Sequence, residues 1–313
     1  MTGGGGPGSG AAAPSRWQAI AARIDAYERL IRLDKPIGTL LLLWPTLSAL
    51  WLAAFGSPSW IVVGIFALGT LLMRSAGCAI NDYADRNFDP HVERTANRPL
   101  ARGEIAPWEA LAVAATLAFC ALLLVLPLNR TTILLSVPAL LITAAYPYCK
   151  RVFALPQGFL GIAFSFGIPM AFASVYGEVT PLGWTLFAIN LFWVMAYDTE
   201  YAMVDRDDDL KLGLKTSAIT FGRFDVLVVM FCYAVYLTGL TWIGSERQMG
   251  PLFYVGVLAA SLIALWHYRL IRNRRRADCF RAFLGNHWLG FAVFAGIVAD
   301  YSVRLHRTPW WPH

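Results

Sequence analysis

The sequence has little charge for its length. Only 15% of its 313 residues are Asp, Glu, Lys or Arg, and 57% are apolar. A soluble globular domain usually carries about 25% charged residues. Because the deficit extends over the whole chain, it argues against a large soluble core, and we expect a protein embedded in lipid.

The sequence also lacks three signatures that would indicate other classes of protein. Its five cysteines show no CxxC and no metal-ligand spacing, so we expect packing residues rather than a thiolate metal site. Its net charge is +6, but no basic domain or RNA-binding motif accompanies that charge, which argues against a nucleic-acid partner. Residues 1–15 are rich in Gly, Pro, Ser and Ala and contain no basic segment leading into a cleavable apolar core. We therefore expect a disordered tail at 1–15, not a signal peptide, and a second tail at 304–313.

Nine long apolar runs are separated by short polar or Gly/Pro-rich breaks. A membrane helix needs about 20 mostly apolar residues, and these runs approach or reach that length. They lie at 37–55, 60–80, 108–127, 131–147, 158–176, 182–203, 224–243, 252–268 and 284–302. The sequence therefore predicts an all-α integral membrane protein whose helices form one bundle within 37–303.

The positions of the basic residues predict an orientation. Of the 26 Lys and Arg residues, 21 lie in segments on the same side of the membrane as the N-terminus and four lie on the other side. Cytoplasmic loops carry the excess of Lys and Arg. We therefore expect a cytoplasmic N-terminus and an external C-terminus. Residues 16–36 alternate apolar and charged residues at helical spacing, which predicts an amphipathic helix on the cytoplasmic surface.

The first of two acidic segments, NDYADRNFD, follows the second apolar run. Asn81, Asp85 and Asp89 are spaced by four, so on a helix they form one stripe. Pro90 follows directly and is expected to end that helix. The segment thus predicts oxygen ligands that extend a membrane helix just past its cytoplasmic end.

The second acidic segment, DRDDD, follows the sixth apolar run. Asp205 and Asp209 are one helical turn apart, and Asp198 with Tyr201 continues their stripe toward the membrane. Four spans separate the two segments, so both are expected on the same face of the membrane. This placement predicts two four-helix halves of like orientation with a ninth helix appended.

Carboxylates gathered at helix C-termini need a counter-charge. The C-terminal end of a helix carries partial negative charge, and facing carboxylates repel each other unless cations lie between them. Mg²⁺ prefers hard oxygen ligands, typically one or two carboxylates together with substrate phosphates and waters. The two segments therefore predict a site that holds Mg²⁺ and a diphosphate between the halves. The alternative is a pair of solvated acidic loops that aid solubility.

Basic residues in the same cytoplasmic layer are candidates for contact with a diphosphate. They are Arg94, Arg98, Lys150 and Arg151. Arg binds phosphate with a planar fork, and Lys acts as a point charge. Each could equally be one of the basic residues that orient the chain. Tyr146, four residues before Lys150, could pack on an isoprene unit or belong to the core.

Arg74 differs because it lies inside a predicted span, where an ionisable residue is costly and by default functional. Positions 74, 78, 81, 85 and 89 fall on one helical face, so Arg74 is expected to line the same cavity, about three turns deeper. It could bind the carboxylate of an aromatic acid, helped by the amide of Asn81. The alternative is an internal ion pair with Asp198 or Asp300.

These residues carry a family pattern. The chain resembles the UbiA-type prenyltransferases from LDKPIGTLLLLWPT at 33–46 to the ninth span, and Asn81, Asp82, Asp85 and Asp89 match the motif NDxxDxxxD. The stretches RTANRPL, YPYCKR and YDTEYAMVDRDDDLKLGLKTSAI resemble the branch that acts on 4-hydroxybenzoate. Glu200, within the last stretch, stands where we expect variation.

The resemblance implies a fold of nine transmembrane helices around a central cavity that opens sideways to lipid. It implies Mg²⁺ as cofactor, bound by Asn81, Asp85, Asp89, Asp205 and Asp209. It also implies that Arg98, Lys150 and Arg151 contact the diphosphate and that Arg74 contacts the aromatic carboxylate. The expected substrates are polyprenyl diphosphate and 4-hydroxybenzoate, joined in ubiquinone biosynthesis, within membrane lipids and without nucleic acid.

The expected reaction forms a bond between an allylic carbon and an aromatic ring. The diphosphate leaves, and the ring carbon ortho to the hydroxyl attacks the electron-poor prenyl carbon. Asp198 is a candidate to orient the phenol or to accept the proton, although the diphosphate itself could take that proton. The alternatives are a related prenyltransferase with another acceptor, such as a naphthoate, homogentisate or haem, and a secondary transporter with acidic midplane sites.

Overall fold

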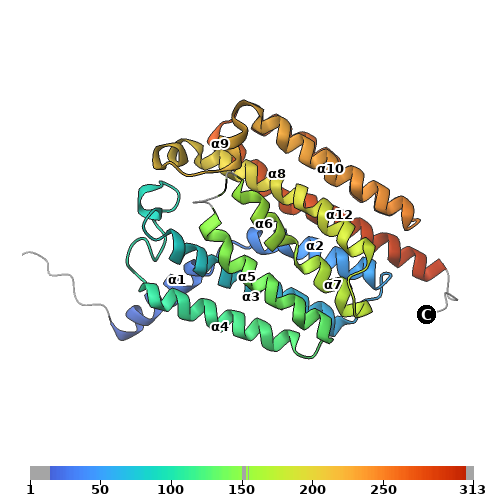
Figure 1. Ribbon diagram of the computed structural model, residues 1–313, viewed down its shortest axis with the longest axis horizontal. Coiled ribbons are helices and arrows are strands. Elements are labelled where there is room, and N and C mark those ends of the chain that lie inside the picture. The colour runs from blue at the N-terminus through green and yellow to red at the C-terminus, as the bar shows by residue number, and fades with distance from the viewer. Residues whose placement is uncertain (1–14, 150–152, 154, 308–313) are drawn as a thin grey trace, which may run out of the picture.

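The computed structural model describes residues 15–149, 153 and 155–307, and all regular structure within them is helical (Figure 1). The α-helices are α1 (Arg16–Leu30), α2 (Ile37–Ala53), α3 (Trp60–Asp85), α4 (Pro107–Val125), α5 (Arg130–Cys149), α6 (Pro156–Ser165), α7 (Gly167–Tyr176), α8 (Pro181–Leu212), α9 (Ser217–Phe221), α10 (Asp225–Glu246), α11 (Pro251–Ile271) and α12 (Arg276–Arg307). Two short 3₁₀ helices, η1 (Asp89–His91) and η2 (Gly222–Phe224), interrupt the loops. The all-α prediction is confirmed.

Each predicted span coincides with helix. The run at 158–176 is divided into α6 and α7, which meet at Phe166. Four helices of the bundle begin with a proline at their first position, where the missing N–H would have no helical partner. The run at 284–302 is the later part of α12, which continues to Arg307. The position of proline therefore accounts for where these four helices begin.

Seven helical segments are long and apolar enough to cross a membrane. They are α3, α4, α5, α6 with α7, α9 with α10, α11 and α12. Helix α2 is a shorter apolar helix, and α8, with 32 residues, is long but carries the second acidic segment. The count of nine spans therefore stays a prediction, whereas a multi-pass membrane protein is established.

Two apolar cores hold the bundle together. The larger core joins α2, α7, α8, α10, α11 and α12 through fully buried side chains such as Leu50, Phe172, Trp193 and Phe253. A smaller one packs Ala26 and Leu30 of α1 against α3, α4 and the segment between them. Because these helices also expose many large apolar residues on their outer faces, the bundle is built to contact lipid.

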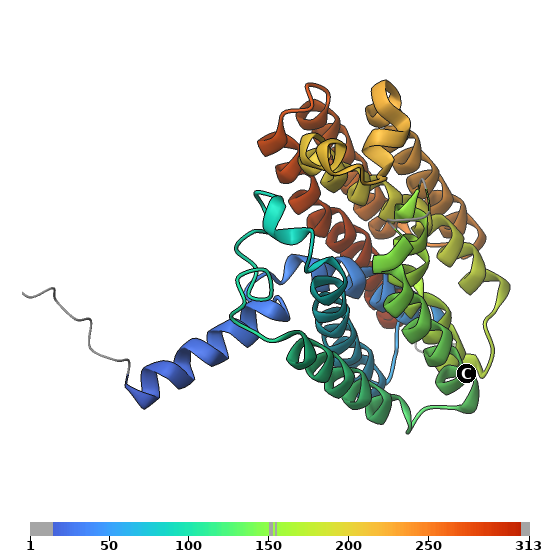
Figure 2. The same ribbon diagram turned by 60° about the vertical axis from the view of Figure 1, so that its left-hand side comes forward.

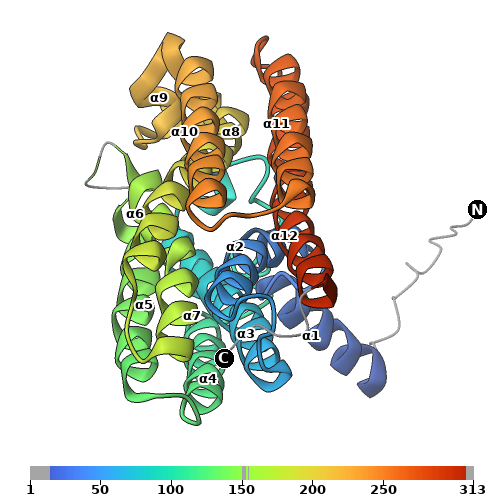
Figure 3. The ribbon, with the colours of Figure 1, turned by 90° about the vertical axis from the view of Figure 1, so that its right-hand side faces the viewer.

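Helix α1 lies outside the bundle. Figure 2 shows it projecting away from the other helices, with only its C-terminal end against them. Trp17, Ile20 and Ile24 are exposed on it. In Figure 3, α9 lies at the same end of the molecule as the first residues of α10 and the last residues of α11. The acidic end of α8 lies at this end too, because α9 follows α8 after four residues.

Candidate active site

A cavity of about 1040 Å³ opens among α2–α6, α8 and the segment 86–106. Its apolar part is lined mainly by α3, α4 and α5, and its polar part by the C-terminal ends of α3 and α8. All five predicted oxygen ligands, Asn81, Asp85, Asp89, Asp205 and Asp209, line it. The structure therefore brings the two acidic segments to one cavity, as their spacing along the chain predicted.

The first acidic segment departs from the predicted helix. Helix α3 ends at Asp85, and the backbone N–H of Phe88 donates to the Asp85 carbonyl at 2.8 Å in a turn. Asp89 then begins the 3₁₀ helix η1, whose second residue is Pro90. The expectation that Asp89 continues the helical face of Arg74 and Asp85 is thus wrong, because α3 ends at Asp85, five residues before the proline, and residues 86–88 form a turn. Asp89 nevertheless lines the cavity.

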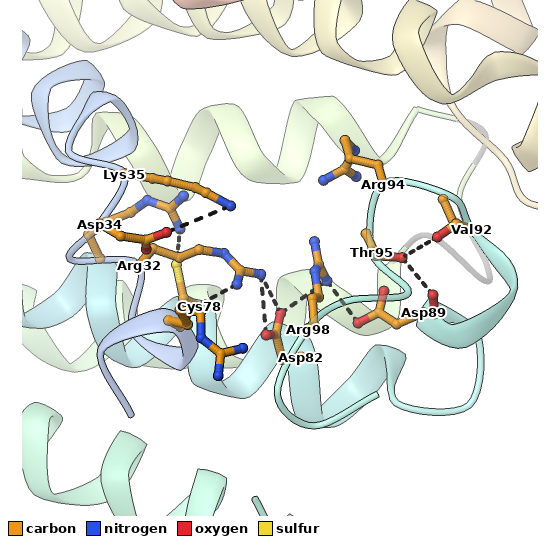
Figure 4. A network of polar contacts seen from close by, with 12 residues as sticks. Arg32, Asp34, Lys35, Cys78, Asp82, Asp89, Val92, Arg94, Thr95 and Arg98 are labelled. Carbon is orange, nitrogen blue, oxygen red and sulfur yellow. Dashed lines mark hydrogen bonds and ion pairs between the residues drawn. The ribbon is translucent and has the colours of Figure 1, made fainter. Parts of the chain in front are cut away.

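Arginines from the segment 86–106 neutralise both acidic segments. Arg98 Nη1 donates to Asp89 Oδ2 at 2.8 Å, as Figure 4 shows. Arg94 grips Asp205 with two nitrogens, at 2.9 and 2.6 Å to Oδ2, and lies 4.5 Å from the centre of the Tyr201 ring. Such paired contacts are the strong form of carboxylate recognition. Both predicted phosphate-binding arginines therefore reach the site, where they bind its carboxylates.

Burial sets the electrostatics of Asp89. The residue is 5% exposed, and removal from water raises the pKa of its carboxyl group because burial disfavours the charged form. Arg98 opposes that rise, while Asp82 and Asp85 add to it through like-charge repulsion. A carboxylate in these surroundings gains from any further cation that enters the cavity.

The donor set suits a hard divalent cation. It consists of carboxylate oxygens and one amide oxygen, which are the ligands that Mg²⁺ and similar ions prefer. Within the described ranges, no three His, Cys, Asp or Glu side chains are close enough to hold a metal ion together. The chemistry of the donors therefore fits the cation, while Arg94 and Arg98 occupy carboxylates that a cation would use.

Arg74 lies deeper in the same cavity, as predicted. Its guanidinium packs over Gly38, where an added Cβ would lie 2.5 Å from Nε and Nη2, so any larger residue there would make the Arg74 side chain shift. It donates to the Cys78 sulfur, and its buried Nε has no hydrogen-bond partner. Asp300 instead accepts from the Gly250 N–H at 2.8 Å, so the proposed Arg74–Asp300 pair does not form. No ion pair of Arg74 occurs in the described part of the chain.

The remaining predicted residues divide into two groups. Tyr146, Asp198 and Tyr201 line the cavity. Lys150 and Arg151 lie outside the described residues. Sequence reasoning missed Arg32 and Lys215, which also line the cavity, because each was counted only among the basic residues that orient the chain.

The fold and site define a class of protein: a multi-pass helical membrane protein with a cavity that is apolar along most of its wall and rich in aspartate and arginine at one end. Residues 42–290 match the model of the UbiA prenyltransferase family. The chain belongs to that family.

Curated relatives are similar along almost the whole chain. A protein of Burkholderia vietnamiensis named 4-hydroxybenzoate octaprenyltransferase is 61% identical over 284 residues, covering 91% of this chain and 98% of that protein. A protein of the same name from Azoarcus sp. is also 61% identical and covers 91% of this chain and 99% of the relative.

Solved structures share the fold. The apo structure of a UbiA homolog from Aeropyrum pernix K1 superposes with a TM-score of 0.73 at 25% identity, covering 84% of this chain and 97% of that one. A UbiA homolog from Archaeoglobus fulgidus bound to GPP and Mg²⁺ gives a TM-score of 0.64 at 17% identity, covering 86% and 99% of the two chains.

Proposed function

We propose that this chain is a 4-hydroxybenzoate polyprenyltransferase. It moves a polyprenyl group from polyprenyl diphosphate to the ring carbon ortho to the hydroxyl of 4-hydroxybenzoate, in ubiquinone biosynthesis. The observation that carries this proposal is that one cavity joins both aspartate segments, Arg98 and Arg74 beside a long apolar lining. The relatives that are 61% identical over most of their length bear the matching name.

The aspartate end of the cavity is the proposed diphosphate site. Asn81, Asp85, Asp89, Asp205 and Asp209 would hold Mg²⁺. When bound, the cation supplies positive charge that stabilises the diphosphate as it leaves. Arg98 is proposed to contact the diphosphate directly, together with Lys150 and Arg151. The dependence on Mg²⁺ is supported by the oxygen donor set, and the Archaeoglobus fulgidus homolog was solved with Mg²⁺ bound.

Arg74 is the proposed partner of the aromatic carboxylate. Its buried Nε lacks a hydrogen-bond partner, and leaving such a donor unpaired costs free energy that a ligand oxygen would recover. Anchored there, the acid would place its hydroxyl-bearing ring toward the aspartate end. Holding two reactants in this relation, in a cavity that excludes water, is a major source of rate enhancement.

Bond formation follows once the diphosphate is bound at the aspartate end and the aromatic acid at Arg74. The allylic carbon becomes electron-poor as the diphosphate departs, and the ring carbon ortho to the hydroxyl attacks it. The ring proton is lost to restore aromaticity. Asp198 lines the cavity and is the proposed group that orients the phenol or accepts the proton. Tyr146 lies at the wall of the same cavity and is proposed to pack on the first isoprene units.

The proposed location is the bacterial inner membrane, with the N-terminus in the cytoplasm and the C-terminus in the periplasm. The bias of 21 against four Lys and Arg residues supports this orientation. It places the aspartate end of the cavity at the cytoplasmic surface, where a water-soluble aromatic acid arrives. The donor's prenyl tail would lie along the apolar lining.

Membranes that contain the chain test the proposal directly. They are incubated with labelled 4-hydroxybenzoate, Mg²⁺ and a ladder of prenyl diphosphates that includes octaprenyl diphosphate, the donor that the relatives' names suggest. The expected result is a lipid-soluble labelled product that disappears with EDTA and with Asp85→Ala. Product from a naphthoate or homogentisate, but not from 4-hydroxybenzoate, would replace the acceptor. Transport of an acid without product would overturn the enzyme assignment.

A further inference from the structure

Asp82 is the aspartate of the first acidic segment that the proposed metal ligands leave out. Its side chain is fully buried, although it lines the cavity wall. Arg32 Nη2 donates to both of its oxygens, at 2.8 and 3.2 Å, and Arg98 Nη1 forms an ion pair with its Oδ1 at 3.0 Å. A carboxylate held by two arginines acts as a counter-ion, not as a free ligand.

Arg98 joins Asp82 to the proposed diphosphate site. Its Nη1 lies between Asp82 Oδ1 and Asp89 Oδ2, at 3.0 and 2.8 Å. In Figure 4 the chain of contacts runs from Arg32 through Asp82 and Arg98 to Asp89. The other nitrogens of Arg98 have no bond to the described side chains, so they remain for a ligand in the cavity. Asp82 thus holds Arg98 in place even when Asp89 turns to another partner.

Arg32 is held in a special position for this contact. It follows α1, 50 residues before Asp82, and its backbone φ is +59°, because it is the left-handed residue that closes α1: the Leu33 N–H donates to the Glu28 carbonyl at 3.2 Å across it. Its Nη1 also donates to the Arg29 carbonyl at 3.1 Å, which fixes the guanidinium. The cap of α1 therefore sets where the Arg32 side chain leaves the backbone.

The charges explain why two arginines meet one aspartate. Asp82 alone would neutralise Arg98 and weaken its attraction for an anion. With Arg32 also bound to Asp82, the three groups keep one net positive charge, and Arg98 is the member of the trio that adjoins the metal-site aspartate Asp89. Buried charges at this spacing interact strongly, because little water screens them.

We propose that Arg32 and Asp82 are positioning residues for the diphosphate. Asp82 fixes the guanidinium of Arg98, and Arg32 cancels the charge of Asp82 so that Arg98 stays available to an anion. This inference rests on the proposed function, since it deepens the role of Arg98 there. It also makes the segment that directly follows α1 part of the active site.

The test measures binding of inorganic diphosphate with Mg²⁺ to the purified full chain by calorimetry, so it does not require turnover. Arg32→Gln should weaken binding about tenfold, the effect of one lost charge-assisted interaction. Adding Asp82→Asn to Arg32→Gln should recover most of that loss, because the uncompensated carboxylate is then gone while the amide oxygen of Asn can still accept from Arg98 and hold it in place. A merely structural role predicts the opposite, namely that the two losses add. Arg32→Lys should bind within about threefold of the unsubstituted chain, since it keeps the charge.

Arg29→Gln is the matched control, since Arg29 lies three residues before Arg32, in the last turn of α1, but pairs with Asp25 and Glu104 and does not line the cavity. It should leave diphosphate binding unchanged. In turnover assays, Arg32→Gln should raise KM for the prenyl diphosphate and leave KM for the aromatic acid unchanged. Should Arg32→Gln not fold, Arg32→Lys and Asp82→Asn alone carry the comparison, and equal weakening by both overturns the proposal.

The two proposals fail in different ways. Normal diphosphate binding by Arg32→Gln in a chain that prenylates 4-hydroxybenzoate overturns the positioning role alone. Diphosphate binding that depends on Arg32 in a chain that does not prenylate 4-hydroxybenzoate overturns the proposed function alone. A chain that does not bind diphosphate overturns both.

Discussion

Two buried polar networks in this molecule differ in charge and in place. The first joins Arg32, Asp82, Arg98 and Asp89 at the cavity wall. The second joins Glu200 of α8, Tyr233 of α10, His267 of α11 and Asn286 of α12. The Tyr233 hydroxyl is 2.9 Å from each of its three partners, and Asn286 Nδ2 donates to Glu200 Oε2 at 2.8 Å. Within the described residues, none of these four lines the cavity.

The difference shows how to distinguish a network that binds a ligand from one that holds helices together. The cavity network is made of full charges, and its arginines have nitrogens left over for a ligand. The second network directs its hydrogen bonds inward and ties four helices together at a depth where lipid offers no partners. Helix α8 takes part in both regions, with Asp198 and Asp205 at the cavity and Glu200 on its other side. The cavity network should therefore govern activity, and the second network should govern stability.

The largest effect should come from the carboxylates of the cavity. Asp85→Ala or Asp205→Ala should lower Mg²⁺-dependent prenyl transfer by about 10²–10³-fold or more, because each removes a preorganised charge from the site of the leaving group. Initial rates in membranes with equal amounts of inserted protein measure this. Near-normal turnover by purified Asp85→Ala would show that the metal assignment is wrong and that the cavity carboxylates do not govern activity.

Loss of Arg74 should affect one substrate more than the other. Arg74→Ala should raise KM for 4-hydroxybenzoate by about 10- to 100-fold, the range expected for hydrogen bonds to a charged group, and change KM for the prenyl diphosphate much less. Steady-state kinetics with each substrate varied in turn measure the split. An equal rise in both KM values would mean that Arg74 maintains the shape of the cavity and does not recognise the aromatic carboxylate.

A methyl group at Gly38 should reproduce part of that effect without removing the arginine. In Gly38→Ala, the new Cβ would lie 2.5 Å from two guanidinium nitrogens of Arg74, so the side chain must shift. We expect KM for 4-hydroxybenzoate to rise several-fold, less than in Arg74→Ala, because a flexible side chain relieves part of the clash. The same kinetic assay measures it, and Gly64→Ala, where nothing lies within 4 Å, is the control.

The sequence predicts the helices and the residue stripes, but not the partners across the bundle. Apolar run length gives nearly every membrane helix, and four-residue spacing puts Asn81 and Asp85 on one face, because both depend on neighbours along the chain. Asp89 departs from that face because a local turn intervenes. Arg32 reaches Asp82 across 50 residues, and Glu200 meets Asn286 across 86. Such pairs depend on how helices pack against one another, which residue spacing does not encode. The sequence alone therefore gives no reason to expect a fixed residue at Glu200.

The smallest effect on activity should come from the second network, and a pair of variants separates its role from the cavity's. Glu200→Ala removes one of the three partners of the Tyr233 hydroxyl and leaves Asn286 Nδ2 with only the Ala282 carbonyl, at 3.1 Å, and each lost hydrogen bond costs about 0.5–1.5 kcal/mol. Thermal unfolding of the purified protein should therefore shift downward, while the fraction that remains folded keeps its KM values and its turnover within about twofold.

Glu200→Gln is the matched variant, since an amide can still accept from Asn286 and still hydrogen-bond with Tyr233. It should keep most of the stability and all of the activity. If both variants instead kept the unfolding temperature of the unsubstituted protein but lost turnover, Glu200 would act on the reaction through α8. Burial away from the cavity would then no longer separate a structural network from a functional one, because the helix that carries Asp205 would transmit a change on one side to its other side.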